Sequence, residues 1–210
     1  MSRSDDEVAL IYRVASACLA YPGAEFVADL GSFEAALQAV RHPAARGLRE
    51  FLSATADFTA DQRTAAYVDT FDFTNRHSLY LTWWTDGDTR NRGVALVRFK
   101  EHYRAHGFDF ADDELPDFLP AVLEFCALAR TDALLIEHRP ALELLRIALS
   151  EKGNPYASVL ESVCATLPGA SPTDRASARA MARSGPPRET VGLEPYGHLG
   201  MLPLLTGEHR

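Results

Sequence analysis

Apolar residues recur every three or four positions along most of this chain, with polar residues between them. This spacing places the apolar side chains on one face of an α-helix, so the pattern predicts helices. No run of alternating apolar and polar residues is bounded by turn signals, and no strand is predicted. The clearest apolar stripe, with spacings of three and four, consists of Tyr156, Val159, Leu160, Val163, Cys164 and Leu167.

Local signals mark where these helices begin and end. Ser4 with Glu7, and Thr59 with Gln62, have the spacing of a capping box, in which each side chain bonds the other residue's backbone N–H. Gly107 follows an apolar stripe and suits the left-handed backbone that ends a helix. The sequence therefore predicts an all-α, single-domain bundle of about seven or eight helices. They are expected near residues 4–21, 26–40, 43–52, 59–71, 90–106, 116–126, 142–152 and 154–167.

The chain divides into three parts by composition. Residues 1–167 hold the periodic pattern and form the predicted helical domain. Residues 168–190 are rich in Ala, Ser, Pro and Arg, and they have too few large apolar side chains to offset the entropy of ordering. We expect this segment to be a flexible linker. Residues 191–210 are apolar again, and we expect this C-terminal tail to dock on the domain or on a partner.

Composition and charge narrow the functional classes. The 210 residues include 21 basic and 29 acidic side chains, and the net charge of −8 disfavours binding to nucleic-acid phosphates. No apolar stretch is long enough to span a membrane, and the N-terminus lacks the basic region of a secretory signal. The three cysteines form no CxxC pair, which favours reduced thiols in a helical core. We expect a cytoplasmic protein that neither binds nucleic acid nor inserts into a membrane.

Candidate catalytic residues are few. The nucleophile motif GxSxG and the phosphate-binding motif GxGxxG are absent. His102 and His106 are four residues apart on a predicted helix, so both imidazoles can face one metal ion, with Glu101 or Glu124 as helpers. No third ligand lies at tight spacing to them. A helical metal-dependent hydrolase using this pair is the enzymatic alternative to a protein without catalytic activity.

Three short motifs lie in the most unusual stretch of the chain. They are SLYL at residues 78–81, GDTRNRG at residues 87–93 and ELPDFLP at residues 114–120. In sequence, order and spacing, these motifs resemble the NarJ family of nitrate reductase assembly chaperones, within the TorD-like group of redox-enzyme maturation chaperones. The resemblance extends over about residues 7–167 and is strongest over residues 67–124. It implies the all-helical NarJ/TorD-like fold.

The resemblance also implies a function. A NarJ-like protein is a cytoplasmic chaperone with no enzymatic activity and no cofactor of its own. It binds the immature catalytic (alpha) subunit of respiratory nitrate reductase, through that subunit's N-terminal segment and a further site. It holds the subunit competent until the molybdenum cofactor, bis-molybdopterin guanine dinucleotide, is inserted. A chaperone for another molybdoenzyme client is the alternative within the same group.

A helical bundle can bind such a client by leaving a groove for the apolar face of a partner helix. We expect Leu79, Tyr80 and Phe118 to form the apolar wall of this groove, because aromatic side chains give large contact areas. The acidic surface of the chain suits a basic client segment. The predicted client-binding residues are Tyr67, Phe71, Asp72, Leu79, Tyr80, Arg90, Arg92, Pro116, Asp117, Phe118, Pro120 and Glu124.

The charged members of this set have two predicted roles. Asp72, Asp117 and Glu124 are expected to bind positive charge on the client. Arg90 and Arg92 either pair with these acids inside the domain or contact the client. The acids are therefore the predicted source of charge selectivity.

Two other features bear on the same groove. Pro116 and Pro120 are expected to shape the entry into the next helix, because proline suits a first turn and not a helix interior. Residues 191–205 are apolar, and the predicted linker holds them at high effective concentration near the groove. We expect them to occupy the groove in the free protein, as an internal stand-in for the client.

Overall fold

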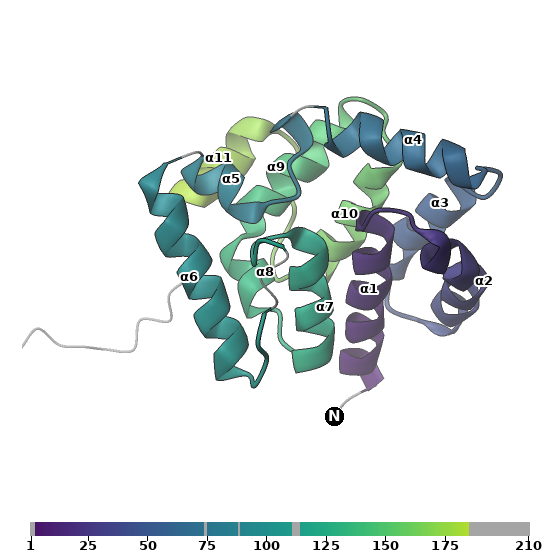
Figure 1. Ribbon diagram of the computed structural model, residues 1–210, viewed down its shortest axis with the longest axis horizontal. Coiled ribbons are helices and arrows are strands. Elements are labelled where there is room, and N and C mark those ends of the chain that lie inside the picture. Colours follow the sequence, from purple (N-terminus) through teal and green to yellow (C-terminus); the bar gives the residue numbers. More distant parts are fainter. Residues whose placement is uncertain (1–2, 74, 88, 111–113, 185–210) are drawn as a thin grey trace, which may run out of the picture.

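Helices form the framework of the protein (Figure 1). The computed structural model describes residues 3–184 apart from 74, 88 and 111–113. Within these residues the chain forms eleven α-helices, one 3-10 helix and no strand, so the predicted all-α class is confirmed. None of these helices is both long and apolar enough to cross a membrane. Their bounds are α1 Arg3–Leu19, α2 Ala24–Ala39, α3 Ala45–Ala54, α4 Ala60–Phe71, η1 Asn75–His77, α5 Leu81–Asp86, α6 Arg90–Ala105, α7 Leu119–Ala129, α8 Ala133–Glu137, α9 Arg139–Ser150, α10 Tyr156–Thr166 and α11 Arg175–Ser184.

The core lies where α1, α7 and α10 pack together. α1 runs along α7 and also contacts α10, which in turn packs on α3 and α9. These helices meet because apolar side chains stabilise the fold by about 25 cal/mol for each Å² they remove from water. In Figure 1, α2, α3 and α4 lie on the right of the molecule, and α5, α6, α8 and α11 lie on the left. Fully buried core residues include Ile11, Val14, Leu19, Leu48, Leu123, Leu142, Val159 and Leu160.

One of the two predicted capping boxes is confirmed. Thr59 Oγ1 accepts a hydrogen bond from the backbone N–H of Gln62, and Gln62 Oε1 accepts one from the N–H of Thr59, at the start of α4. The box predicted for Ser4 and Glu7 is wrong, because α1 begins one residue before Ser4. Glu7 Oε2 instead accepts hydrogen bonds from the backbone of residues 41–42, which ties α1 to the turn between α2 and α3.

The predicted count of about seven or eight helices is too low, since the described residues form eleven α-helices. Two of the additional helices, α5 and α8, have six and five residues, too few to show a helical period in the sequence. His138 separates α8 from α9, because its backbone, at φ −99° and ψ 16°, leaves the helical region. The third additional helix, α11, lies in the segment predicted as a linker.

The structure corrects the predicted linker, residues 168–190, for residues 175–184. These form α11, which packs on α9. Ala178 is fully buried there among apolar side chains of α9. Small alanine side chains allow the two helices to approach closely, so α11 can be held although Met181 is its single large apolar residue. The end of the predicted linker and the apolar tail at 191–210 lie outside the described residues.

A buried ion cluster holds the start of the same segment against α9. Glu143 is fully buried. Its Oε1 lies 3.4 Å from Nη2 of Arg139, and its Oε2 lies 2.8 Å from Nε of Arg146. Arg139 also donates to the carbonyl oxygen of Gly169 (2.9 Å), and Arg146 donates to that of Pro172 (2.6 Å). The arginines of α9 therefore connect a buried charge to the backbone that leads into α11.

Gly47 lies where α3 approaches α10 closely. A Cβ atom at this position would lie 2.2 Å from the carbonyl oxygen of Ser158 and 2.8 Å from Oγ of Ser162. We expect Gly47→Ala to lower the free energy of unfolding by about 1–3 kcal/mol, because α10 must move away from α3. Urea denaturation followed by circular dichroism measures this change.

Gly31→Ala is the matched control for this substitution. Gly31 lies inside α2, and apart from its chain neighbours and the backbone of its own helix no atom lies within 4 Å of the added Cβ. Alanine should stabilise the protein here by about 0.5–1 kcal/mol, because glycine loses more conformational entropy in a helix. Equal effects of the two substitutions would show that α3 and α10 are not in tight contact at Gly47.

Candidate functional site

Two of the three sequence motifs lie side by side in the structure. Tyr80 of the SLYL motif and Phe118 of the ELPDFLP motif form an isolated antiparallel bridge. The backbone N–H of Leu119 donates to the carbonyl oxygen of Leu79 at 2.8 Å. The rings of Tyr80 and Phe118 lie 5.5 Å apart. Pairing of two extended segments thus builds one continuous aromatic surface.

Asp117 connects the third motif to this pair. Its Oδ2 accepts hydrogen bonds from the backbone N–H (3.0 Å) and the hydroxyl (2.5 Å) of Thr82. Arg92, from the GDTRNRG motif, donates from Nε to the same hydroxyl at 3.2 Å. Its guanidinium carbon also lies 5.7 Å from the centre of the Tyr80 ring, where the ring attracts a cation. The three motifs therefore form one connected unit, and Arg92 bonds the hydroxyl of Thr82 and contacts the Tyr80 ring inside the domain.

Two of these motifs, SLYL and ELPDFLP, line a groove of about 380 Å³. The rest of the lining comes from the segment that follows α1 and from α4 and its C-terminal end. The ring of Tyr67 in α4 lies 5.6 Å from that of Tyr21 and 5.0 Å from that of Phe71. Aromatic side chains give the groove a large apolar contact area. The lining residues are Tyr21, Tyr67, Phe71, Asp72, Ser78, Leu79, Tyr80, Glu114 and Phe118.

Two acidic side chains accompany this aromatic lining. Asp72 is exposed at the end of α4, and half-buried Glu114 accepts a hydrogen bond from the Tyr80 hydroxyl at 3.0 Å. Burial, together with this bond, raises the pKa of Tyr80 to about 12, so the phenol stays neutral and continues to donate to Glu114. The two carboxylates suit a partner that has positive side chains beside its apolar ones.

Six of the twelve predicted client-binding residues line this groove. Arg90 is exposed at the start of α6 and is not part of the lining. Glu124 lines a separate hollow of about 140 Å³. Pro116 and Pro120 are buried, and Pro120 lies in the first turn of α7, as the predicted role in helix entry requires. The six in the groove are Tyr67, Phe71, Asp72, Leu79, Tyr80 and Phe118.

The prediction omits three lining residues, Tyr21, Ser78 and Glu114. Ser78 and Glu114 open the SLYL and ELPDFLP motifs, so their place in those motifs was the available signal. Tyr21 precedes a Pro-Gly pair that indicates only where α1 ends. No local pattern indicates that the end of α1 meets α4.

The structure corrects the role predicted for Asp117, because its carboxylate is fully buried and cannot meet a client. We expect Asp117→Ala to lower the free energy of unfolding by about 1–3 kcal/mol, since Thr82 would lose its buried acceptor. Asp72→Ala, at an exposed position, should change it by less than about 0.5 kcal/mol. Guanidinium denaturation of both variants makes the comparison, and a stable D117A protein would contradict this structural role.

The histidine pair has no metal-binding surroundings in the described part of the chain. The rings of His102 and His106 stack with their centres 4.8 Å apart. Among the described residues, no group of three or more His, Cys, Asp or Glu side chains is arranged to hold a metal ion. Burial, and then the neighbouring His106, lower the pKa of His102, so its imidazole is neutral at pH 7. These residues give the hydrolase alternative no support.

The three cysteines are buried and unpaired, as the sequence predicts. Burial raises the pKa of Cys18 and Cys164 far above the usual range, and that of Cys126 to about 12. A nucleophilic cysteine must be a thiolate near neutral pH, and these three are protonated there. They are therefore small apolar core residues.

An aromatic groove on a helical bundle is typical of proteins that accept the apolar face of a partner's helix. Comparison with known sequences identifies the protein family within this class. The chain belongs to the nitrate reductase delta subunit family, whose family model matches residues 34–161. The resemblance predicted from the three motifs is thereby confirmed.

Curated relatives extend this result over most of the chain. It is 41% identical over 162 residues to the nitrate reductase-like protein NarX of Mycobacterium tuberculosis, covering 75% of this chain but only about a quarter, 24%, of NarX. It is 30% identical over 171 residues to the probable nitrate reductase molybdenum cofactor assembly chaperone NarJ of Bacillus subtilis, covering 80% of this chain and 92% of that protein. Identity to the Escherichia coli K12 chaperone NarJ is 35% over 100 residues, 46% of this chain and 42% of that protein.

Proposed function

We propose that this protein is a system-specific maturation chaperone for a respiratory nitrate reductase. It binds the immature catalytic (alpha) subunit in the cytoplasm, assists insertion of the molybdenum cofactor, and catalyses no reaction itself. The names of the Bacillus and Escherichia relatives support this role. The observation that carries the proposal is the aromatic groove with two carboxylates that the SLYL and ELPDFLP motifs build together with α4.

The chemistry of the groove specifies the client segment. Its aromatic lining fits a short amphipathic helix whose apolar side chains are spaced by three and four residues. Asp72 and Glu114 attract basic side chains on the flanks of that helix, which speeds encounter more than it adds affinity. The N-terminal segment of the immature subunit is the proposed occupant.

The size of the groove suits a temporary contact. A volume of about 380 Å³ is at the lower end of the range for ligand sites, so only a few anchor side chains can enter. Binding energy concentrated in a few aromatic anchors gives a complex that can form and dissociate. Release follows once the client segment is taken up by the maturing enzyme.

The test is co-purification with the catalytic subunit. The tagged full-length chain is mixed with cofactor-free subunit, with the same subunit lacking its N-terminal segment, and with mature enzyme. We expect strong capture of the first, weaker capture of the second and none of the third. Equal capture of all three forms would contradict the proposal, and capture of a different apo-molybdoenzyme in preference would identify another client.

A further inference from the structure

Helix α6 has an apolar and basic face that the fold leaves uncovered. Its inner face packs on the rest of the domain. The ring of Phe99 stacks on that of His138 with their centres 4.7 Å apart, and the hydroxyl of Tyr103 donates to the carbonyl oxygen of Pro116 at 2.6 Å. On the outer side, Val94 and Val97 are 61% and 53% exposed. Three positions apart on one helix, they lie close together on its surface.

A hollow between α6 and α8 continues this face. Its volume is about 490 Å³, and Val94 and His102 of α6 line it together with Leu134 of α8 and His138. The acids Asp86 and Glu137 also line this hollow, together with Arg98, so the excess of positive charge lies on the outer face of α6 and not inside the hollow. Among the residues that the structure describes, the buried ring atoms His102 Nε2 and His138 Nδ1 find no hydrogen-bond partner. A hollow of this volume, with Val94 and Leu134 in its lining, can accept an apolar side chain.

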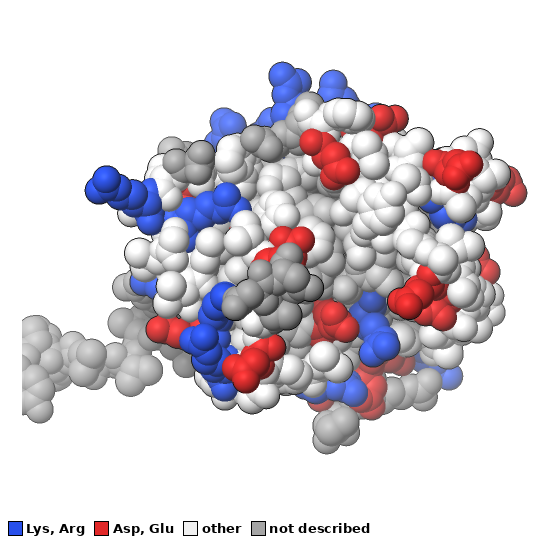
Figure 2. All heavy atoms as spheres, viewed as in Figure 1, with Lys and Arg blue, Asp and Glu red and all other residues white. Residues whose placement is uncertain are grey.

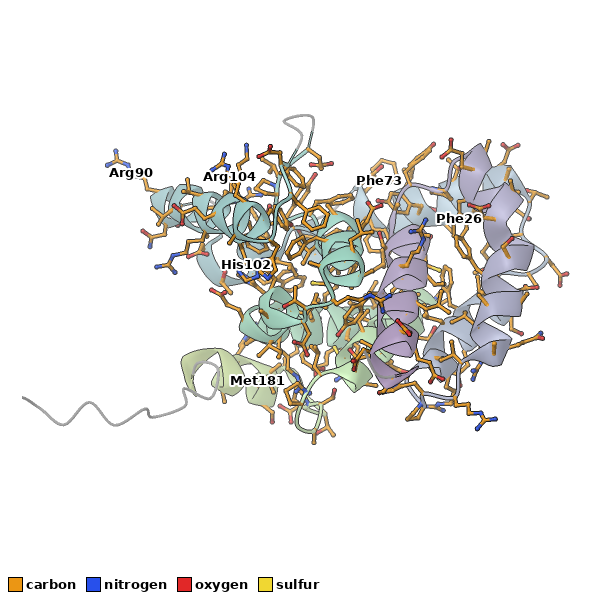
Figure 3. The ribbon with its side chains drawn as sticks, turned by 90° about the horizontal axis from the view of Figure 1, so that it is seen from below. Phe26, Phe73, Arg90, His102, Arg104 and Met181 are labelled. Carbon is orange, nitrogen blue, oxygen red and sulfur yellow. The ribbon has the colours of Figure 1, made fainter. Side chains whose placement is uncertain are left out.

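The charge of α6 is opposite to that of the chain as a whole. Arg90, Arg98 and Arg104 are all exposed, and Glu101 is the acidic residue of this helix. Figure 2 shows basic side chains at the left edge of the molecule, where α6 lies in Figure 1. In Figure 3, Arg90 and Arg104 point away from the body, and His102 points from α6 toward it. The exposed valines are thus flanked by positive charge on a protein of net charge −8.

We propose that the outer face of α6 and its hollow are a second docking surface, which takes an acidic amphipathic helix of a protein partner. Apolar side chains of that helix pack on Val94 and Val97, and one of them enters the hollow. Its carboxylates pair with Arg90, Arg98 and Arg104. Such pairs give specificity and fast association, because opposite potentials meet across the interface.

This surface is separate from the groove. The groove and the hollow beside α6 share no lining residue. The groove is lined by two acidic residues, Asp72 and Glu114, whereas the outer face of α6 has three exposed arginines. The groove therefore favours a basic segment, whereas the arginines on the outer face of α6 favour an acidic one, and both can be occupied at once. A chaperone with this arrangement can hold two parts of one client, or a client and a second protein.

The test uses two synthetic fluorescein-labelled amphipathic peptides with identical leucine positions, one with glutamates and one with lysines on the polar face. Fluorescence anisotropy with the full chain should show binding of the glutamate peptide that weakens as salt is raised. The double variant Val94→Asp with Val97→Asp should bind it at least about tenfold more weakly. Val27→Asp, at an exposed valine of α2, should leave this binding unchanged.

Arg98→Glu is the second variant, and it keeps both valines in place. It should weaken binding of the glutamate peptide and strengthen binding of the lysine peptide. Several results would overturn the proposal: no binding of the glutamate peptide, equal binding of both peptides, or binding that neither variant changes. A wild-type dimer that the double variant converts to monomers would also overturn it, since a second copy of the chain would then be the occupant. Failure of the nitrate reductase assignment would leave these peptide results unaffected.

Discussion

Glu143→Ala is expected to lower the free energy of unfolding by about 3–5 kcal/mol, the range for removal of one member of a buried ion cluster. The Glu143 carboxylate is fully buried between Arg139 and Arg146, whose side chains are 8% and 14% exposed. Without the carboxylate, two largely buried guanidinium groups would have no counter-charge. Chemical denaturation monitored by circular dichroism measures the loss.

Glu151→Ala provides the matched control, because it also removes a glutamate paired with an arginine. Oε2 of Glu151 lies 2.7 Å from Nη2 of Arg175, but the side chains of Glu151 and Arg175 are 51% and 44% exposed. Exposed pairs contribute about 0–1 kcal/mol, since water and salt screen them. Similar losses for the two variants would contradict the difference that burial predicts.

Phe118→Ala is expected to weaken binding of a peptide copied from the client's N-terminal segment by about 30-fold, or about 2 kcal/mol. The Phe118 ring lies against Tyr80 in the middle of the motif unit, where removal of an aromatic anchor reduces apolar contact with the peptide. Isothermal titration calorimetry with the full chain measures the affinity. A thermal melt of the same sample shows whether the variant is folded.

Phe73→Ala is the control for this prediction. Phe73 is 72% exposed and follows α4, but it is not among the lining residues of the groove (labelled in Figure 3). Its removal should change the peptide affinity by less than about twofold, because a single exposed side chain outside an interface contributes little to it. If both variants bind equally well, the peptide does not occupy this groove.

Six of the nine residues that line the groove could be predicted from the sequence. The motifs indicate which segments matter, and Tyr80 and Phe118 are aromatic residues within them. Burial could not be predicted: Asp117 lies in an acidic, apparently exposed stretch, yet the chain folds its carboxylate beneath Thr82. Nor could the position of Tyr21, because the contact between α1 and α4 joins residues far apart in the sequence.

The sequence by itself determined the helical class, the start of α4 and the family of the protein. Each of these depends on local order: an apolar period near 3.6 residues, a capping box, and short motifs at fixed spacing. Only the tertiary structure decided that residues 78–81 pair with residues 114–120 and that residues 175–184 pack on α9. The physical reason is that a periodic stripe specifies which side of a helix is buried, whereas its partner is selected by how all the surfaces fit together.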